Sequence, residues 1–503
     1  MLDHRGDDLN QHSKRLTLAA ATVVLALTAS TAAFAEPWIA PGDVRLRHDI
    51  QMLSDAGLLS GPSISWPIGW SHVARELAQI DLATLTSGQQ AAVERLRALA
   101  QREMKADGIG LSAELAGAVD PTQLRTFEDT PREEGEATLS ADWLGERFAW
   151  KLSATVVADA DDDKTYRADG SYVAMSAGNW MLSAGYLDRW WGPGWEGSLI
   201  LSNNARPVPA IAIDRNEPTP FETRWLSWLG PWRLSTFMGQ YESDRDYENP
   251  LMWGLRVEFR PHPTLQIGVS RTAQWCGDDR PCGFDTFWDL VVGNDNRDEN
   301  LTEDDEPGNQ LGGFDVRWSW PGGRVPLALY AQGTGEDEAG FMPSKYLGLF
   351  GAESWGDVAG GSWRAHVEYA DTACDFLNDP PEFGCAYTHG IYTSGYRYRG
   401  RVQGHAMDAD GESVGVGLMF VEASGHRWDL LARNLKVNRA GVAPGHSLAD
   451  SPTDVQDIAL THERAYAWGN ITFSLGFSDV NPAGTTVLED GVRGFVSWRH
   501  AVR

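Results

Sequence analysis

The sequence predicts a mainly β protein: a transmembrane antiparallel β-barrel with a small N-terminal α-helical bundle. Three observations predict it. After about residue 110, apolar and polar residues alternate in roughly sixteen to twenty segments, each about as long as a tilted membrane strand. The connections between these segments are either tight turns or long loops, as in outer-membrane barrels. The preceding segment has helical periodicity instead.

Residues 1–35 have the features of a secretory signal peptide. Lys14 and Arg15 precede the apolar run Leu16–Ala29, and Ala33–Ala35 forms a small-x-small cleavage site. The sequence contains no second apolar run of this kind. A mature protein in a membrane would therefore have to be a barrel.

Residues 36–110 are expected to form a periplasmic helical bundle of three helices. Ser71 is the expected N-cap of the second helix, and Ser87 with Gln90 the expected capping box of the third. The apolar and stop residues that mark the helices are Val44, Ile50, Leu53 and Gly57, then Val73, Leu77 and Ile80, then Ala92, Leu96 and Leu99. A unit of this size is small for a core of its own, so we expect it to dock on something larger.

Residues 111–503 are expected to form the barrel. Leu251, Trp253 and Leu255 alternate with Arg256 and Glu258, and charged residues in mid-strand suit a wet lumen. A soluble sandwich or propeller would also alternate, but the apolar face here is aromatic at its ends, as in membrane barrels. The expected long loops are residues 158–170, 277–285, 293–309, 333–344, 371–395 and 437–457.

Composition excludes some functions. The formal charge is -28, with 70 acidic and 42 basic residues, which argues against nucleic acid as a partner. The 22 tryptophans and 13 tyrosines fit interfacial girdles, sugar stacking or both. No nucleophile elbow, Walker loop or HExxH motif is present, and no pair among the many carboxylates stands out for glycosidase chemistry. We expect no catalytic residues, no metal site and no cofactor.

Four cysteines lie in two local pairs, Cys276/Cys282 and Cys374/Cys385, each within one expected loop. In an exported protein this pattern predicts two disulfides. The acidic run 294–306 resembles an oxygen-rich cation loop but lacks the glycine and spacing of an EF-hand. A solvated loop is the favoured interpretation, and a divalent cation that bridges to an anionic polysaccharide or lipopolysaccharide is the alternative.

The stretch 186–209 is the main candidate site. Aromatic faces, planar guanidinium donors and paired amides suit a sugar, which offers C–H faces and hydroxyls. The candidate polysaccharide-binding residues are Arg189, Trp190, Trp191, Trp195, Asn203, Asn204, Arg206 and Arg215. The alternative is structural: a buried or membrane-interface loop whose arginines pair with Asp188 or Glu196.

The segment RWWGPGWEGSLILSNNARPVPAIAIDRN resembles the signature of the capsule-assembly Wzi outer-membrane proteins. So does the preceding order of signal peptide, the DI-x-x-LSDAGLL stretch from Asp49 to Leu59, and Trp66-Pro67. The resemblance implies an eighteen-stranded outer-membrane barrel with a periplasmic bundle at its base. It also implies a lectin that holds capsular or related exopolysaccharide, that is not an enzyme, and whose lumen is blocked.

The function predicted from these observations is an outer-membrane lectin of a Gram-negative bacterium. Its expected partners are capsular polysaccharide or exopolysaccharide, outer-membrane lipid and lipopolysaccharide; we expect no nucleic acid partner and a monomer. Two alternatives belong to other classes: a transport pore for small or charged solutes, and an outer-membrane hydrolase of lipid or glycan. Bilayer conductance or turnover of polysaccharide would distinguish them.

Overall fold

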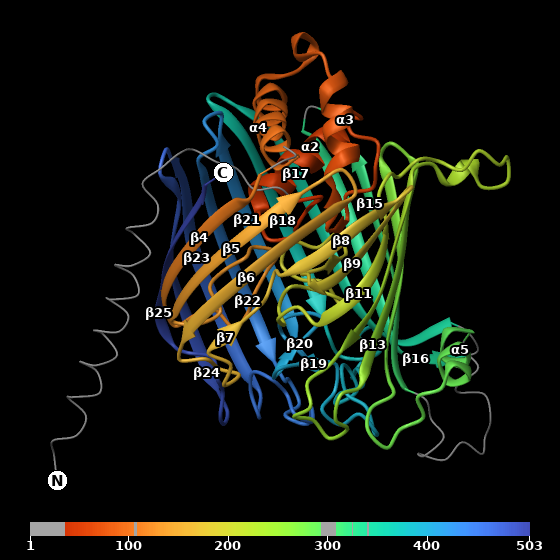
Figure 1. The fold of residues 1–503 in the computed structure, drawn as a ribbon. Helices are drawn as coiled ribbons and strands as arrows, with labels where there is room; N and C mark the ends of the chain where they lie inside the picture. Colours follow the sequence, from red (N-terminus) through yellow and green to blue (C-terminus); the bar gives the residue numbers. More distant parts are fainter. Residues whose placement is uncertain (1–35, 105–107, 293–307, 324, 340–341, 503) are drawn as a thin grey trace.

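The computed structural model describes residues 36–104, 108–292, 308–323, 325–339 and 342–502. It shows a β-barrel with a group of helices at one end and long connections at the other (Figure 1). We call these the bundle end and the loop end. The expected signal peptide, residues 1–35, and the acidic run 294–306 lie outside the described residues.

The barrel is closed, antiparallel and 18-stranded, and β25 pairs with β4 to complete it. The short β7 and the longer β8 both pair with β6 and together take one position in the wall. The strands are β4 Gly110–Val119, β5 Gly135–Leu144, β6 Phe148–Ala158, β7 Tyr166–Arg167, β8 Tyr172–Ala177, β9 Trp180–Tyr186, β11 Pro209–Arg215, β12 Trp232–Gln240, β13 Leu251–His262, β14 Leu265–Trp275, β15 Gly308–Trp320, β16 Leu327–Ala339, β17 Met342–Val358, β18 Gly361–Asp371, β21 Glu412–Glu422, β22 Arg427–Val437, β23 Thr453–Tyr466, β24 Gly469–Pro482 and β25 Gly491–Val502.

The two faces of the wall have opposite polarity. Arg256, Arg317 and Arg364 point into the lumen and are each 1% exposed. Residues such as Leu152 and Leu475 point outward and are 62% and 66% exposed. An outer surface this apolar around a charged interior belongs in lipid, because the same pattern in water would expose the nonpolar face. The structure confirms the expected transmembrane barrel.

The three expected helices are present as α2 Val44–Asp55, α3 Trp70–Gln79 and α4 Ser87–Glu103, joined by the 3-10 turn η1 Leu82–Thr84. Both capping predictions were wrong by one or two positions. Gly69 is the N-cap of α3, in place of Ser71, and the capping box of α4 joins Thr86 to Gln89. None of the described helices combines the length and apolar character that crossing a membrane requires.

The bundle docks into the barrel through α2, whose side chains are almost all buried. Asp55 makes a bidentate pair with Arg317 of β15, at 2.6 and 2.8 Å. His48 contacts Ser362 at the start of β18, with 2.9 Å between Nε2 and Oγ. Polar strand residues that would otherwise line a water-filled channel therefore bind the side chains of α2. Two short pairings complete this region: β1 Trp38–Ile39 pairs with β3 Ile68–Gly69 within the N-terminal segment, and β2 Ser65–Trp66 joins that segment to β10 Trp190–Trp191.

The connections differ in part from the prediction. Of the expected loop 333–344, the described residues 333–339 and 342–344 belong to the paired ends of β16 and β17. The connection after β14 contains a helix that periodicity did not reveal, α5 Phe284–Val292. It lies outside the barrel, where Phe287 packs on the outward rings of Trp253 and Trp275 with centroids 5.7 and 5.1 Å apart (Figure 1).

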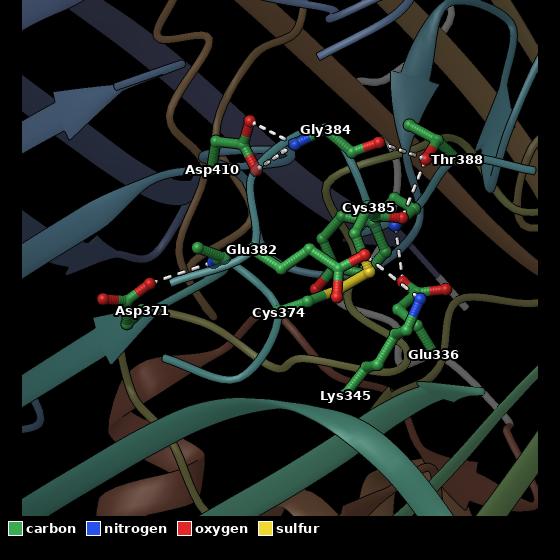
Figure 2. Close-up of a disulfide and its surroundings, with 11 residues drawn as sticks. Glu336, Lys345, Asp371, Cys374, Glu382, Gly384, Cys385, Thr388 and Asp410 are labelled. Atoms are coloured by element: carbon green, nitrogen blue, oxygen red, sulfur yellow. Dashed lines mark hydrogen bonds and ion pairs between the residues drawn. A yellow bond between two sulfur atoms is a disulfide. The ribbon is translucent and has the colours of Figure 1, made fainter. Parts of the chain in front are cut away.

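Both expected disulfides form, Cys276–Cys282 beside α5 and Cys374–Cys385 in the connection from β18 to β21. The second disulfide closes a compact turn in which Cys374 and Glu382 exchange backbone hydrogen bonds of 2.9 and 3.1 Å. Asp410 accepts from the backbone N–H of Gly384 at 2.8 Å, so the turn is tied to the far end of the same connection (Figure 2).

Candidate functional site

The tryptophan-rich stretch folds into the lumen between β9 and β11, and we call residues 187–208 the plug. Trp190 and Trp191 form β10 and are 0% and 1% exposed. Phe127 lies edge-on to Trp190, with centroids 5.2 Å apart, and the Trp190 Nε1–H donates to the carbonyl of Gly192 at 3.1 Å. In this structure the two rings face protein, not solvent.

Trp195 is held at the centre of the barrel by charged residues. Its Nε1–H donates to Glu353 at 2.9 Å, and its backbone N–H donates to Glu368 at 2.8 Å. The Arg47 guanidinium of α2 lies 4.1 Å from the ring centroid, and the His366 ring stacks at 5.8 Å. These contacts join the bundle, the plug and the barrel wall.

The amides and the first arginine of the predicted site also have internal partners. The side-chain N–H groups of Asn203 and Asn204 donate to the carbonyls of Phe127 and Val402, at 3.1 and 2.9 Å. Arg189 lies over the Phe237 ring at 4.5 Å. Their place in the packed lumen supports the structural alternative for this part of the stretch.

The last two predicted residues lie at opposite ends of the barrel. Arg206 pairs with Asp169 at 2.7 Å and with Asp162 at 2.5 Å near the loop end. Burial alone would lower the pKa of Arg206, but the hydrogen bonds that its guanidinium donates to Asp169 and Asp162 raise it. Arg215, at the bundle end of β11, lies 3.9 Å from the Trp232 centroid. The structure does not gather the predicted residues into one surface, and their role in binding stays a prediction.

The plug is locked in place by the connection from β18 to β21. The hydroxyls of Tyr387 and Tyr396 donate to the plug carbonyls of Leu199 and Ile200, at 2.7 and 2.8 Å. The backbone N–H of Ser202 donates to the carbonyl of Gln403 at 2.8 Å. One continuous apolar cluster includes residues of α2, the plug, this connection and the wall. The described interior is therefore packed with the protein's own chain.

An open hollow of about 660 Å³ lies at the loop end. It is formed by loops that are far apart in sequence: 120–134, 159–161, 399–401 and 486–489, with the ends of β23 to β25 as its wall. None of the described residues that line it is aromatic. Sequence reasoning missed this site because it searched for a single aromatic stretch, whereas the hollow forms only where loops that are far apart in the sequence meet.

Arginines form part of the lining of the hollow, in which Arg132, Arg399, Arg401 and Arg493 stand among seven carboxylates, and Arg125 is buried behind them. Arg132 reaches the plug and donates to the carbonyl oxygens of Asn203 and Asn204, at 2.8 and 2.6 Å. Burial, then the charge of neighbouring Arg132, lowers the pKa of Arg401, and the same two causes lower the pKa of Arg125 to about 9. Three guanidinium groups thus lie close enough to repel one another.

Acidic and amide groups form the rim of the hollow. Asp161, with 56% of its side chain exposed, pairs with Arg401 at 3.1 Å and accepts from Gln123 at 3.4 Å. Guanidinium, carboxylate, amide and hydroxyl groups in one open space can bind the hydroxyls and carboxylates of a sugar. Among the described residues, no three His, Cys, Asp or Glu side chains are placed to hold a metal ion.

Fold and site together define a class: a transmembrane barrel filled by its own chain, with a polar hollow at the end opposite its helical bundle. Comparison with known proteins gives the family. Residues 107–474 match the family model described as capsule assembly protein Wzi. The chain belongs to this family.

Two similar proteins extend the match. A Klebsiella pneumoniae protein described as "uncharacterized 55.8 kDa protein in cps region" is 32% identical over 369 residues, which cover 71% of this chain and 70% of that protein. A solved structure from Escherichia coli is described as Wzi, an outer membrane protein involved in group 1 capsule assembly and a carbohydrate-binding β-barrel. It is 26% identical, with a TM-score of 0.81, and covers 92% of this chain and 99% of its own.

Proposed function

We propose that this protein is an outer-membrane lectin that binds capsular or related exopolysaccharide and holds it at the cell surface of a Gram-negative bacterium. The observation that carries the proposal is the polar hollow of about 660 Å³ at the loop end, above a lumen packed with protein. The similarity to the E. coli carbohydrate-binding barrel and to the K. pneumoniae protein of the cps region supports it. In this orientation the bundle lies in the periplasm and the hollow faces outward.

Arg132 and Arg401 give the hollow two sites for an acidic group of a sugar, although carboxylates outnumber arginines in the lining as a whole. A carboxylate placed between Arg401 and Arg132 would relieve the repulsion between their guanidinium groups and accept charge-assisted hydrogen bonds from both. Asp161 and Gln123 on the rim would bind neighbouring hydroxyls. Without an aromatic platform, recognition relies on polar contacts, and each contact with one repeat is weak.

Retention of a long polymer does not need a tight single site. Many barrels in one membrane would hold one chain at many repeats, and linked sites raise overall avidity far above the affinity of one site. The protein therefore acts as a monomer that binds the polymer without cleaving it. The size distribution of native polymer incubated with the protein is expected to stay unchanged, and a shift to shorter chains would contradict this.

Binding of the purified protein to its native polymer tests the hollow. Arg401→Ala and Gln123→Ala are expected to weaken binding by about three- to tenfold each, because each removes hydrogen bonds to the ligand. Arg224→Ala is the matched control, since Arg224 is an exposed arginine at the bundle end. If both hollow variants bind like the wild type, the site is elsewhere.

A further inference from the structure

The bundle-end rim of the barrel carries an apolar notch that the function proposed above does not use. It measures about 670 Å³ and lies between the β13–β14 turn and the β15–β16 turn. Trp318 and Trp320 form one side; they are 50% and 39% exposed, with centroids 4.6 Å apart. Both point away from the lumen, because the alternate residues Arg317 and Ser319 are buried inside.

The opposite side of the notch is polar at its edge. His262 and Thr264 belong to the β13–β14 turn, and Leu265 follows them at the start of β14. The Nδ1 of His262 accepts from the backbone N–H of Thr264 at 3.3 Å, so a neutral His262 ring carries its proton on Nε2. The exposed imidazole thus offers an N–H donor beside an aromatic surface.

The same turn is flanked on its other side by an arm of the chain, residues 216–231, which projects sideways from the bundle end (Figure 1). Trp225 and Trp228 of the arm are 87% and 61% exposed. The arm is anchored on the outer wall, where Trp228 lies edge-on to Phe259 of β13 with centroids 6.4 Å apart. Gly230 ends its short helix η2 Ser227–Leu229 at φ 67°, where a Cβ would lie 2.1 Å from the carbonyl oxygen of Arg260.

The occupant of the notch follows from its position. The notch is continuous with the outward apolar face of β14 and β15, which is the lipid-facing surface of the barrel. Tryptophan is enriched at the boundary between acyl chains and headgroups. An apolar wall, a tryptophan pair and a hydrogen-bond donor at the rim match a molecule with acyl chains and a phosphate. A lipid fits better than a free sugar because the notch opens onto the lipid-facing wall, which an acyl chain can cover and a sugar cannot.

We propose that the notch binds one phospholipid of the membrane leaflet at the bundle end. Its acyl chains lie along Trp318, Trp320 and Leu265, and its phosphate oxygens accept from His262. The arm adds exposed aromatic residues next to the notch. This side of the barrel therefore contacts the lipid leaflet more extensively than the other sides do.

Native mass spectrometry of the full-length protein in detergent, titrated with phosphatidylethanolamine or phosphatidylglycerol, tests the proposal. The wild type is expected to bind one lipid well above the nonspecific background, and Trp318→Ala/Trp320→Ala to lower its affinity about tenfold. The matched control is Tyr466→Ala/Trp468→Ala, an aromatic pair of the same spacing that stacks at 5.0 Å and does not line the notch. Equal binding by wild type and notch variant, or equal losses in both pairs, would overturn the site.

Two further measurements keep the test decisive. If the alanine pair does not fold, judged by heat-modified mobility on gels, Trp318→Phe/Trp320→Phe replaces it and is expected to lose part of the affinity. His262→Ala is expected to weaken phospholipid binding severalfold and to leave diacylglycerol binding unchanged; equal losses for both lipids would contradict the phosphate contact. Polymer binding by these variants is expected to match wild type, which separates this proposal from the lectin function.

Discussion

The plug and the loop-end hollow differ in the side chains they use and in how far these are exposed to solvent. The plug holds Trp190, Trp191 and Trp195 out of solvent, with their N–H groups and faces matched to protein partners. The hollow has guanidinium, carboxylate and amide groups open to solvent, and no ring among the described residues that line it. Residue types that suit a sugar are therefore not evidence of a sugar site until their exposure is known.

The comparison also explains the tryptophan content. One group of tryptophans fills the lumen, and a second group, including Trp180, Trp428 and Trp468, lies exposed around the bundle end at 37%, 42% and 54%. The second group is where a membrane boundary favours these rings. Packing and lipid contact account for these tryptophans without any role in ligand binding.

The largest expected effect that separates the two regions is on stability. Trp190→Ala removes a fully buried ring and is expected to cost about 3–5 kcal/mol of unfolding free energy, measured by denaturant titration in detergent. Polymer binding per folded molecule is expected to stay unchanged. Trp225→Ala, at an 87% exposed position, is the control. A stable Trp190→Ala protein that no longer binds polymer would instead make the plug the binding surface.

The pH dependence of stability tests the packed interior again. Burial, with a smaller opposing effect of Glu196, lowers the pKa of His405 to about 4 from 6.5. The folded state therefore favours the neutral ring, so the contribution is complete above pH 6.5 and is lost as the pH falls towards 4, by up to about 3 kcal/mol. His405→Gln is expected to flatten this part of the profile. If the loss of stability at low pH is the same in His405→Gln as in the wild type, the His405 ring is in contact with water.

The two disulfides give the smallest contrast. Cys374→Ser/Cys385→Ser is expected to cost about 2–3 kcal/mol and to weaken polymer binding, because that connection carries Arg401 to the hollow. The Cys276–Cys282 disulfide closes a loop beside α5. Its removal by Cys276→Ser/Cys282→Ser is expected to leave polymer binding unchanged. Stability is followed by thermal unfolding, and binding by polymer capture. If both double variants lose polymer binding equally, the effect does not come from a local change at the hollow.

The sequence was sufficient for the barrel, the three N-terminal helices and both disulfides, because each has a local signal. Alternation such as Leu251, Trp253 and Leu255 against Arg256 and Glu258 reports directly which face meets lipid. The cap of α4 was misplaced by one residue because Thr86 and Ser87 are both good caps, and only the backbone decides between them.

The site could not be predicted in the same way. Arg401 and Asp161 are 240 positions apart in the chain, and no local pattern reports their contact. The helix α5 was also missed, since FDTFWDLVV is short and its apolar residues fit a strand as well as a helix. What decides its form is the outer wall against which it packs, which is a tertiary effect.

The position of α5 outside the barrel limits which connections can be shortened. Arg271 of β14 points outward, yet its guanidinium donates to Gln310 at 2.8 Å and to the Val291 carbonyl of α5 at 3.2 Å. A trimmed variant that replaced the β14–β15 connection with a tight hairpin would keep Gln310 of β15 but would remove the α5 carbonyl to which Arg271 donates and the helix that lies over it, and is expected to be less stable than the wild type. Deletion engineering that shortens other surface connections would therefore have to change Arg271 as well.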